Sequence, residues 1–124
     1  MASPGHDPTD AALIAAAREL YNSVQMNEIR AAHKKAFPVT VRIGRYRVWY
    51  EAMPFSGLAS FGTEGFVIGK EAFASEAELK KTLLHELYRL HHSDLARGKG
   101  VDKHTIKAET DAAFQFAERC YMMI

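Results

Sequence analysis

The sequence contains one cysteine, four prolines and no long apolar run. Because Cys120 has no second cysteine to pair with, an intrachain disulfide is excluded, and so is a zinc knuckle built from cysteines. A membrane-spanning helix needs about 20 consecutive apolar residues, and no run approaches that length. The N-terminus also lacks the basic-then-apolar pattern of a secretory signal. We therefore expect a soluble domain with no membrane span. If the domain is exported, the export signal must lie in a different segment.

Neither sign of charge is in excess, since 16 Lys and Arg oppose 15 Asp and Glu. The formal charge of +1 creates no overall field that would attract nucleic acid or an anionic membrane, so any basic patch must be local. A chain of 124 residues with 48% hydrophobic composition is long enough for one core. We predict a single domain over residues 1–124. Its abrupt start, and its end directly after a helical pattern, indicate a domain of a longer polypeptide.

Periodicity and turn residues predict an α+β domain with an N-terminal helix, a small antiparallel sheet that includes a hairpin, and two C-terminal helices. The best-marked boundary is Ser75, which forms a capping box with Glu78 three residues later. Thr105 is expected to cap the last helix. In chain order, the predicted elements are a helix over about 9–34, strands over 39–43 and 46–50, a loop over 54–65, a third strand over 66–68, a helix over 75–92, a loop over 94–103 and a helix over 105–121.

The predicted hairpin places two arginines opposite each other. Gly44 stands at the first central position of a two-residue type II′ turn, which pairs Arg42 with Arg47. Like charges that face each other are separated either by solvent or by an anionic ligand. Together with Arg45, Trp49 and the lysines at 34 and 35, they form the one basic and aromatic concentration of the chain. Arg42 and Arg47 are therefore candidate substrate-binding residues for a nucleic-acid backbone.

The helix over 75–92 has two different faces. Its leucines gather on one side, which predicts packing on the core, and Glu86 lies on the flank. Thr82, His85, Arg89 and His92 form a stripe on the opposite side. This polar stripe either lines a cleft or faces water.

Glu109 falls on the apolar stripe of the last helix, in line with Phe116. A carboxylate on the buried side needs a cation or donor as partner, and the stripe with His85 and Arg89 is the nearest source. The alternative is that Glu109 only complements the helix dipole in the first turn.

His85 and Glu86 match the start of the metallopeptidase helix motif, in which a second histidine stands four residues after the first. Here that position is Arg89, which cannot ligate a metal. His92 lies about 10.5 Å further along the helix axis than His85, a strained distance for two ligands of one ion. The alternative zinc site would use His85, Glu109 and one of His91, His92 or His104.

A metal-free site uses the same residues differently, and we take it as the first hypothesis, with no cofactor. His85 would act as general acid and base, with Glu86 or Glu109 as its partner, while Arg89 would hold a phosphate. Ser93 either bonds a ligand or only a terminal carbonyl of the helix. Such a group of side chains suits cleavage or transfer of a phosphodiester.

The segment from Thr82 to Ser93, TLLHELYRLHHS, followed by ETDAAFQFAE from Glu109 to Glu118, resembles the C-terminal toxin domains of bacterial polymorphic toxins, particularly RHS-repeat proteins. The run from Gly65 to Phe73 also fits, so that the resemblance spans roughly residues 39–122. It implies an effector that is secreted as part of a larger toxin, acts in the cytoplasm of a rival cell and is blocked by a cognate immunity protein. The order of elements further resembles a minimal zincin-like fold.

Three functions follow as hypotheses. The first is a toxin domain that acts as a hydrolase or transferase on a phosphate-containing substrate, RNA or DNA above all. The second is a zincin-like metallopeptidase toxin with an atypical ligand set. The third is a non-catalytic module in which the polar stripe is a protein interface.

Overall fold

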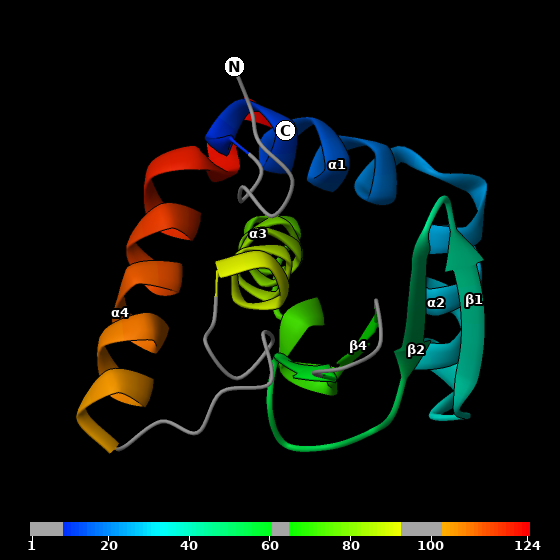
Figure 1. The fold of residues 1–124 in the computed structure, drawn as a ribbon. Helices are drawn as coiled ribbons and strands as arrows, with labels where there is room; N and C mark the ends of the chain where they lie inside the picture. Colours follow the sequence, from blue (N-terminus) through cyan, green and yellow to red (C-terminus); the bar gives the residue numbers. More distant parts are fainter. Residues whose placement is uncertain (1–8, 61–64, 93–102) are drawn as a thin grey trace.

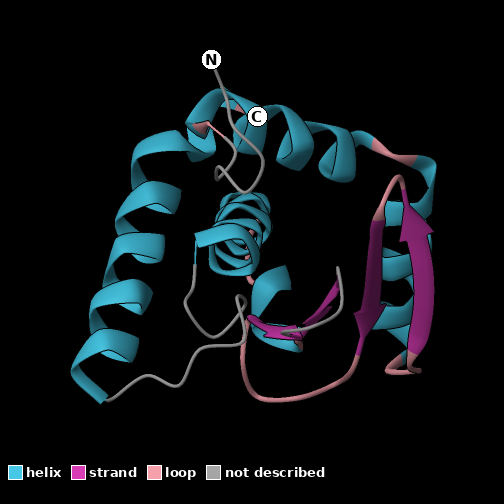
Figure 2. Ribbon diagram, viewed as in Figure 1, coloured by secondary structure: helices cyan, strands magenta, loops and turns pink. Residues whose placement is uncertain are grey.

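The computed structural model describes residues 9–60, 65–92 and 103–124, and their arrangement confirms the predicted α+β class (Figure 2). The helices are α1 (Asp10–Asn22), α2 (Val24–Lys35), α3 (Glu76–His92) and α4 (Lys103–Cys120), with short 3-10 turns η1 (Lys70–Phe73) and η2 (Tyr121–Met123). The strands are β1 (Val39–Ile43), β2 (Tyr46–Tyr50), β3 (Gly57–Ser60) and β4 (Gly65–Ile68). None of the described helices combines the length and the apolar character of a membrane span.

The single N-terminal helix predicted over 9–34 is wrong, because Ser23 divides it into α1 and α2. The backbone of Ser23 is extended, with φ −71° and ψ 153°. Its hydroxyl accepts a hydrogen bond from the amide of Met26 at 3.1 Å and donates one to the carbonyl of Leu20 at 2.8 Å. Serine therefore satisfies backbone groups at both helix ends, and this local bonding competes with a continuous helix.

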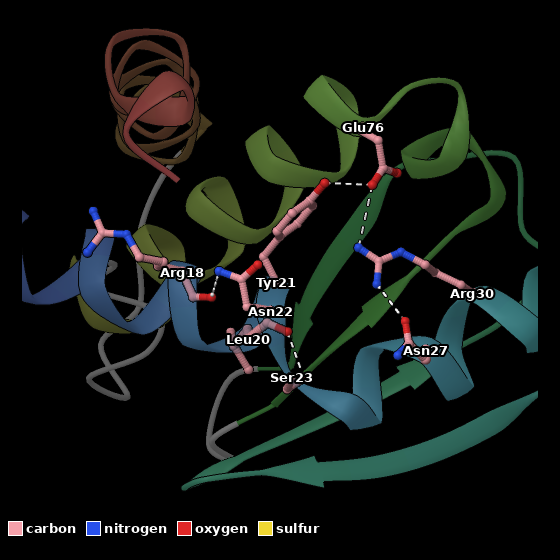
Figure 3. Close-up of polar contacts among 8 residues, drawn as sticks. All are labelled: Arg18, Leu20, Tyr21, Asn22, Ser23, Asn27, Arg30 and Glu76. Atoms are coloured by element: carbon pink, nitrogen blue, oxygen red, sulfur yellow. Dashed lines mark hydrogen bonds and ion pairs between the residues drawn. The ribbon is translucent and has the colours of Figure 1, made fainter.

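Polar contacts connect both N-terminal helices to the start of α3 (Figure 3). The Tyr21 hydroxyl of α1 donates to Glu76 at 2.5 Å, and the Arg30 guanidinium of α2 lies 3.5 Å from the same carboxylate oxygen. The predicted cap of α3 is present, since the Glu78 amide donates to the Ser75 hydroxyl at 3.0 Å. By contrast, α4 begins at Lys103, so that Thr105 lies inside its first turn and is not its cap.

The four strands are ordered β1-β2-β4-β3, and the sheet is mixed. The pairs β1–β2 and β3–β4 are antiparallel, but β2 and β4 run parallel, so the prediction of a purely antiparallel sheet is wrong for this pair. The reason is β3, which lies within the segment predicted as a loop. After β2 the chain passes along the outer edge as β3 and returns in the opposite direction as β4, which is the predicted third strand.

The predicted hairpin is confirmed in both register and turn. Arg42 pairs with Arg47, and Ile43 pairs with Tyr46. Gly44 has φ +59°, whereas Arg45 is not among the described residues with positive φ, as a type II′ turn requires. Both facing arginines are exposed to solvent.

Helix α3 occupies the centre of the molecule (Figure 1). It packs against α4 on one side and against α1, η1 and β3 on others, while α2 covers β1 and β2. Of the leucines on the predicted core side of α3, those at 79, 83 and 87 are fully buried and Leu90 is partly buried, while Leu84 is fully buried as well. Because α4 covers part of the other side, the polar stripe of α3 does not simply face water.

Candidate functional site

A cavity of about 290 Å³ opens between α3, α4, η1 and the segment that leads into β3. The polar side of α3 forms one wall of the cavity. Two further walls each contain an aromatic residue, Phe55 on one and Phe114 on the other. The side chains used below are Thr82, His85 and Glu86 from α3, Phe114 from α4, and Phe55 and Gly57 from the segment around the start of β3. Two of the predicted catalytic residues, His85 and Glu86, thus share one cavity.

Glu86 is the most deeply buried acidic residue of the site, with 4% of its surface exposed. Burial raises the pKa of its carboxyl to about 7, although the nearby Arg89 guanidinium and a backbone hydrogen bond from Ala59 both act to lower it. The carboxyl is consequently about equally populated in its neutral and charged forms near neutral pH. This is the ionisation expected of a group that exchanges protons with a substrate.

His85 has the opposite shift. Burial, followed by the charge of Arg89, lowers the pKa of its imidazole to about 4, and the backbone of Ala113 opposes this effect. The ring lies 4.2 Å from the ring of Phe114, centre to centre, at an interplanar angle of 41°. Its Nδ1 atom is buried without a hydrogen-bond partner, which costs free energy unless a ligand supplies one. At neutral pH the imidazole is therefore uncharged and able to accept a proton.

The glycine at 57 allows β3 to lie directly against α3. A Cβ atom at this position would stand 2.9 Å from the Glu86 Oε2 atom and 2.9 Å from the Thr82 Cγ2 methyl, closer than such atoms approach. The Thr82 hydroxyl is turned away, because it donates to the carbonyl of Glu78 at 2.8 Å. Only a residue without a side chain leaves room for the Glu86 carboxylate beside the strand.

The phase of the β3–β4 ladder explains how Ala59 reaches Glu86. The Gly69 amide donates to the Ser56 carbonyl at 2.8 Å, and bonded and non-bonded pairs alternate in an antiparallel ladder. In the observed register, Gly57 and Ala59 fall on non-bonded pairs, so their N–H groups point to the free edge of β3. The Glu86 carboxylate accepts the hydrogen bond of one of these edge amides, that of Ala59.

The other two residues of the predicted cluster lie outside the cavity wall. Arg89 donates from Nη1 to the Thr110 hydroxyl of α4 at 2.7 Å, and Thr110 in turn donates to the Ile106 carbonyl at 2.8 Å. Glu109 is partly buried on α4 and does not line the cavity. Arg89 still influences the site, because its charge lowers the pKa of both His85 and Glu86.

The predicted substrate-binding arginines lie on the β1–β2 hairpin and do not line this cavity. Arg42 donates to the Arg45 carbonyl at 3.3 Å, and Arg47 lines a shallow hollow with Thr40 and Trp49. Ser93, the remaining predicted site residue, lies outside the described residues.

The residues of the alternative zinc site do not converge. His91 is 2.7 Å from the Tyr46 hydroxyl through Nε2, His92 stacks on Tyr88 with ring centres 4.3 Å apart, and His104 is exposed at the start of α4. Over residues 9–60, 65–92 and 103–124, no three His, Cys, Asp or Glu side chains form a group that could hold a metal ion. The metal-free site and its zinc alternative both stay predictions.

Sequence reasoning missed the cavity residues that α3 does not supply. Phe55 and Gly57 lie in the glycine-rich segment that was predicted as a loop. The only feature of the sequence that could have indicated a site there is an aromatic residue among glycines. Phe114 lies next to the apolar stripe of α4 and keeps 57% of its surface exposed, which distinguishes it from the core aromatics only in the folded molecule. The chain matches no protein-family model, no curated protein and no solved structure.

Proposed function

We propose that this chain is a hydrolase domain in which His85 and Glu86 transfer protons, and that it serves as the effector of an antibacterial toxin. The observation that carries the proposal is the shared cavity, in which a buried carboxyl with a pKa of about 7 stands beside a neutral imidazole. The effector role rests on the resemblance of the α3 and α4 segments to polymorphic toxin domains. It includes delivery within a larger secreted protein and inhibition by an immunity protein.

The two groups divide the work of hydrolysis between them. The free nitrogen lone pair of His85 accepts a proton from water as the water oxygen bonds to the electrophilic centre of the substrate. Protonated Glu86 donates its proton to the leaving group as that bond breaks. One proton then passes from the imidazolium to the carboxylate and restores both groups. The required pair, neutral His85 with protonated Glu86, is most populated between the two pKa values of about 4 and about 7.

The other residues of the cavity support these two. Thr82 and Gly57 fix the distance between α3 and β3, and the Ala59 amide orients the Glu86 carboxyl. The Phe114 ring packs against the His85 ring and holds the imidazole in place. Arg89 is a positioning residue, since it ties α3 to α4 through Thr110 and adjusts both pKa values without lining the cavity.

The test is induced expression in bacteria. The wild-type domain is expected to arrest growth, whereas Glu86→Gln, which keeps the size of the side chain but cannot exchange a proton, is expected to allow normal growth. The matched control is Glu28→Gln on the exposed surface of α2, which should arrest growth like the wild type.

Both variants must be recovered folded and in equal amounts for this comparison. Growth arrest by a folded Glu86→Gln variant would contradict the proposed proton transfer. Normal growth with the wild-type domain would contradict the toxin role.

A further inference from the structure

We infer that the cavity of His85 and Glu86 accepts a cation, namely an alkylammonium or guanidinium group on an apolar stem. This inference deepens the proposed function and rests on it for the assumption that the cavity is where the substrate binds. Such a group occurs on lysine and arginine side chains of polypeptides and on free polyamines. The inference departs from a phosphate-containing substrate, which the sequence favoured.

Among the described residues, acidic side chains outnumber basic ones in the lining of the cavity. Its lining contains four glutamates and one lysine. The glutamates are Glu71 of η1, Glu78 and Glu86 of α3, and Glu118 of α4. Lys81 is already paired with Glu118 at 3.0 Å, and no ion pair of Glu71 or Glu78 occurs within the described residues. The carboxylates of Glu71 and Glu78 would repel a phosphate that entered, whereas they would attract a cation.

The apolar part of the lining is aromatic. Phe55 and Phe114 line the cavity on different walls, and Phe114 is more than half exposed. The face of an aromatic ring attracts a cation and also covers the methylene groups of its stem. The molecule already has this arrangement nearby, because the Lys81 ammonium lies between Glu118 and the Tyr121 ring, 4.7 Å from the ring centre.

The size of the cavity limits what enters. Its volume of about 290 Å³ lies just below the range of typical ligand sites, which begins at about 300 Å³. This space holds one long side chain and excludes a folded nucleic acid. The buried carboxyl of Glu86 then stands at the inner end of the cavity and the exposed carboxylates of Glu71 and Glu118 at its rim.

The test is a binding comparison on the full chain by calorimetry, made with both the wild type and Glu86→Gln so that turnover does not matter. The probes are N-acetyl-lysine methylamide, its isostere N-acetyl-norleucine methylamide, spermidine and inorganic phosphate. We expect the lysine probe to bind at least about fivefold more tightly than the norleucine probe, because only it carries a charge. Tighter binding of the lysine probe than of spermidine assigns the ligand to a polypeptide, and the reverse assigns it to a polyamine.

The double variant Glu71→Gln, Glu78→Gln is expected to bind the lysine probe about two- to tenfold more weakly than the wild type does. Its affinity for the norleucine probe should be unchanged. Glu28→Gln is the control and should leave both unchanged. Equal affinity of the lysine and norleucine probes, or tighter binding of phosphate, would overturn the inference. If the lysine probe binds as expected while Glu86→Gln still arrests growth, the specificity stands and the proposed proton transfer fails.

Discussion

At the scale of single residues, burial acts on two neighbouring side chains in opposite directions. It disfavours the charged form of each group, so it raises the pKa of the Glu86 carboxyl and lowers that of the His85 imidazole. Both side chains are consequently neutral over a shared range of pH, although a carboxyl and an imidazole in water would exchange a proton in that range. Arg89 stabilises the charged carboxylate and destabilises the charged imidazole, which lowers both values together.

The pKa shift of Glu86 predicts a pH-dependent stability. Its carboxyl titrates at about 7 in the fold, against 4.5 ordinarily, so the folded state binds the proton more tightly than the unfolded state does. The contribution of Glu86 is therefore full below pH 4.5 and is lost as the pH rises to about 7. Arg89 is the charged group that acts on Glu86 most strongly, and the titratable groups that share its cavity are Glu78, Lys81 and His85 of α3, Glu71 of η1 and Glu118 of α4.

Glu86→Gln removes this penalty and keeps an acceptor for the Ala59 amide. We expect the variant to equal the wild type in stability near pH 4 and to exceed it by up to about 3 kcal/mol at pH 8, the free energy that corresponds to the shift. Urea unfolding across this pH range measures the difference. Glu28→Gln should show no such trend, and a constant difference for Glu86→Gln would mean that the Glu86 pKa is not raised.

At the scale of elements, the decisive contact is that of β3 with α3. This edge strand approaches the helix so closely that Gly57 has no space for a Cβ atom, and the approach closes one wall of the cavity. The helix itself is fixed independently by the Ser75 cap and by packing on α1 and α4. The position of the strand therefore determines the shape of the site.

Gly57→Ala is expected to destabilise the fold by about 1–3 kcal/mol, because the added methyl forces β3 and α3 apart. Thermal or urea unfolding gives the magnitude. Thr82→Ser removes the Cγ2 methyl that the new Cβ would meet, so the double variant should recover part of the loss. Full stability of Gly57→Ala alone would show that the strand does not lie as close to the helix as described.

Elements with a strong local signal were predictable and elements set by distant contacts were not. The Ser75 cap and the Gly44 turn are fixed by residues a few positions apart, and both were predicted correctly. Ser23 carries an equally local cap, but the apolar periodicity continues across it and concealed the break. β3 is short and glycine-rich, and only its pairing with β4 identifies it as a strand.

At the scale of the whole molecule, the site is assembled from segments far apart in the sequence. His85 and Glu86 were predictable because neighbours on one helix remain neighbours in any fold. The hydrogen bond between Arg89 and Thr110 was not, since only the crossing of α3 and α4 brings these two side chains together. Phe55 and Phe114 line the same cavity only because the sheet and α4 both pack on α3.

The charge of the assembled molecule leads to a last prediction about its cellular target. The net charge is only +1, the cavity is lined by carboxylates, and the exposed arginines at 42 and 47 lie on the hairpin, outside the wall of the cavity. Nucleic-acid binding depends on phosphates that face a continuous positive surface, which the described side chains do not form around His85. Total RNA and DNA from cells arrested by the wild-type domain are therefore expected to remain intact on gels. Degraded RNA or DNA that is absent with Glu86→Gln would instead establish the nuclease that the sequence favoured and exclude the cationic substrate.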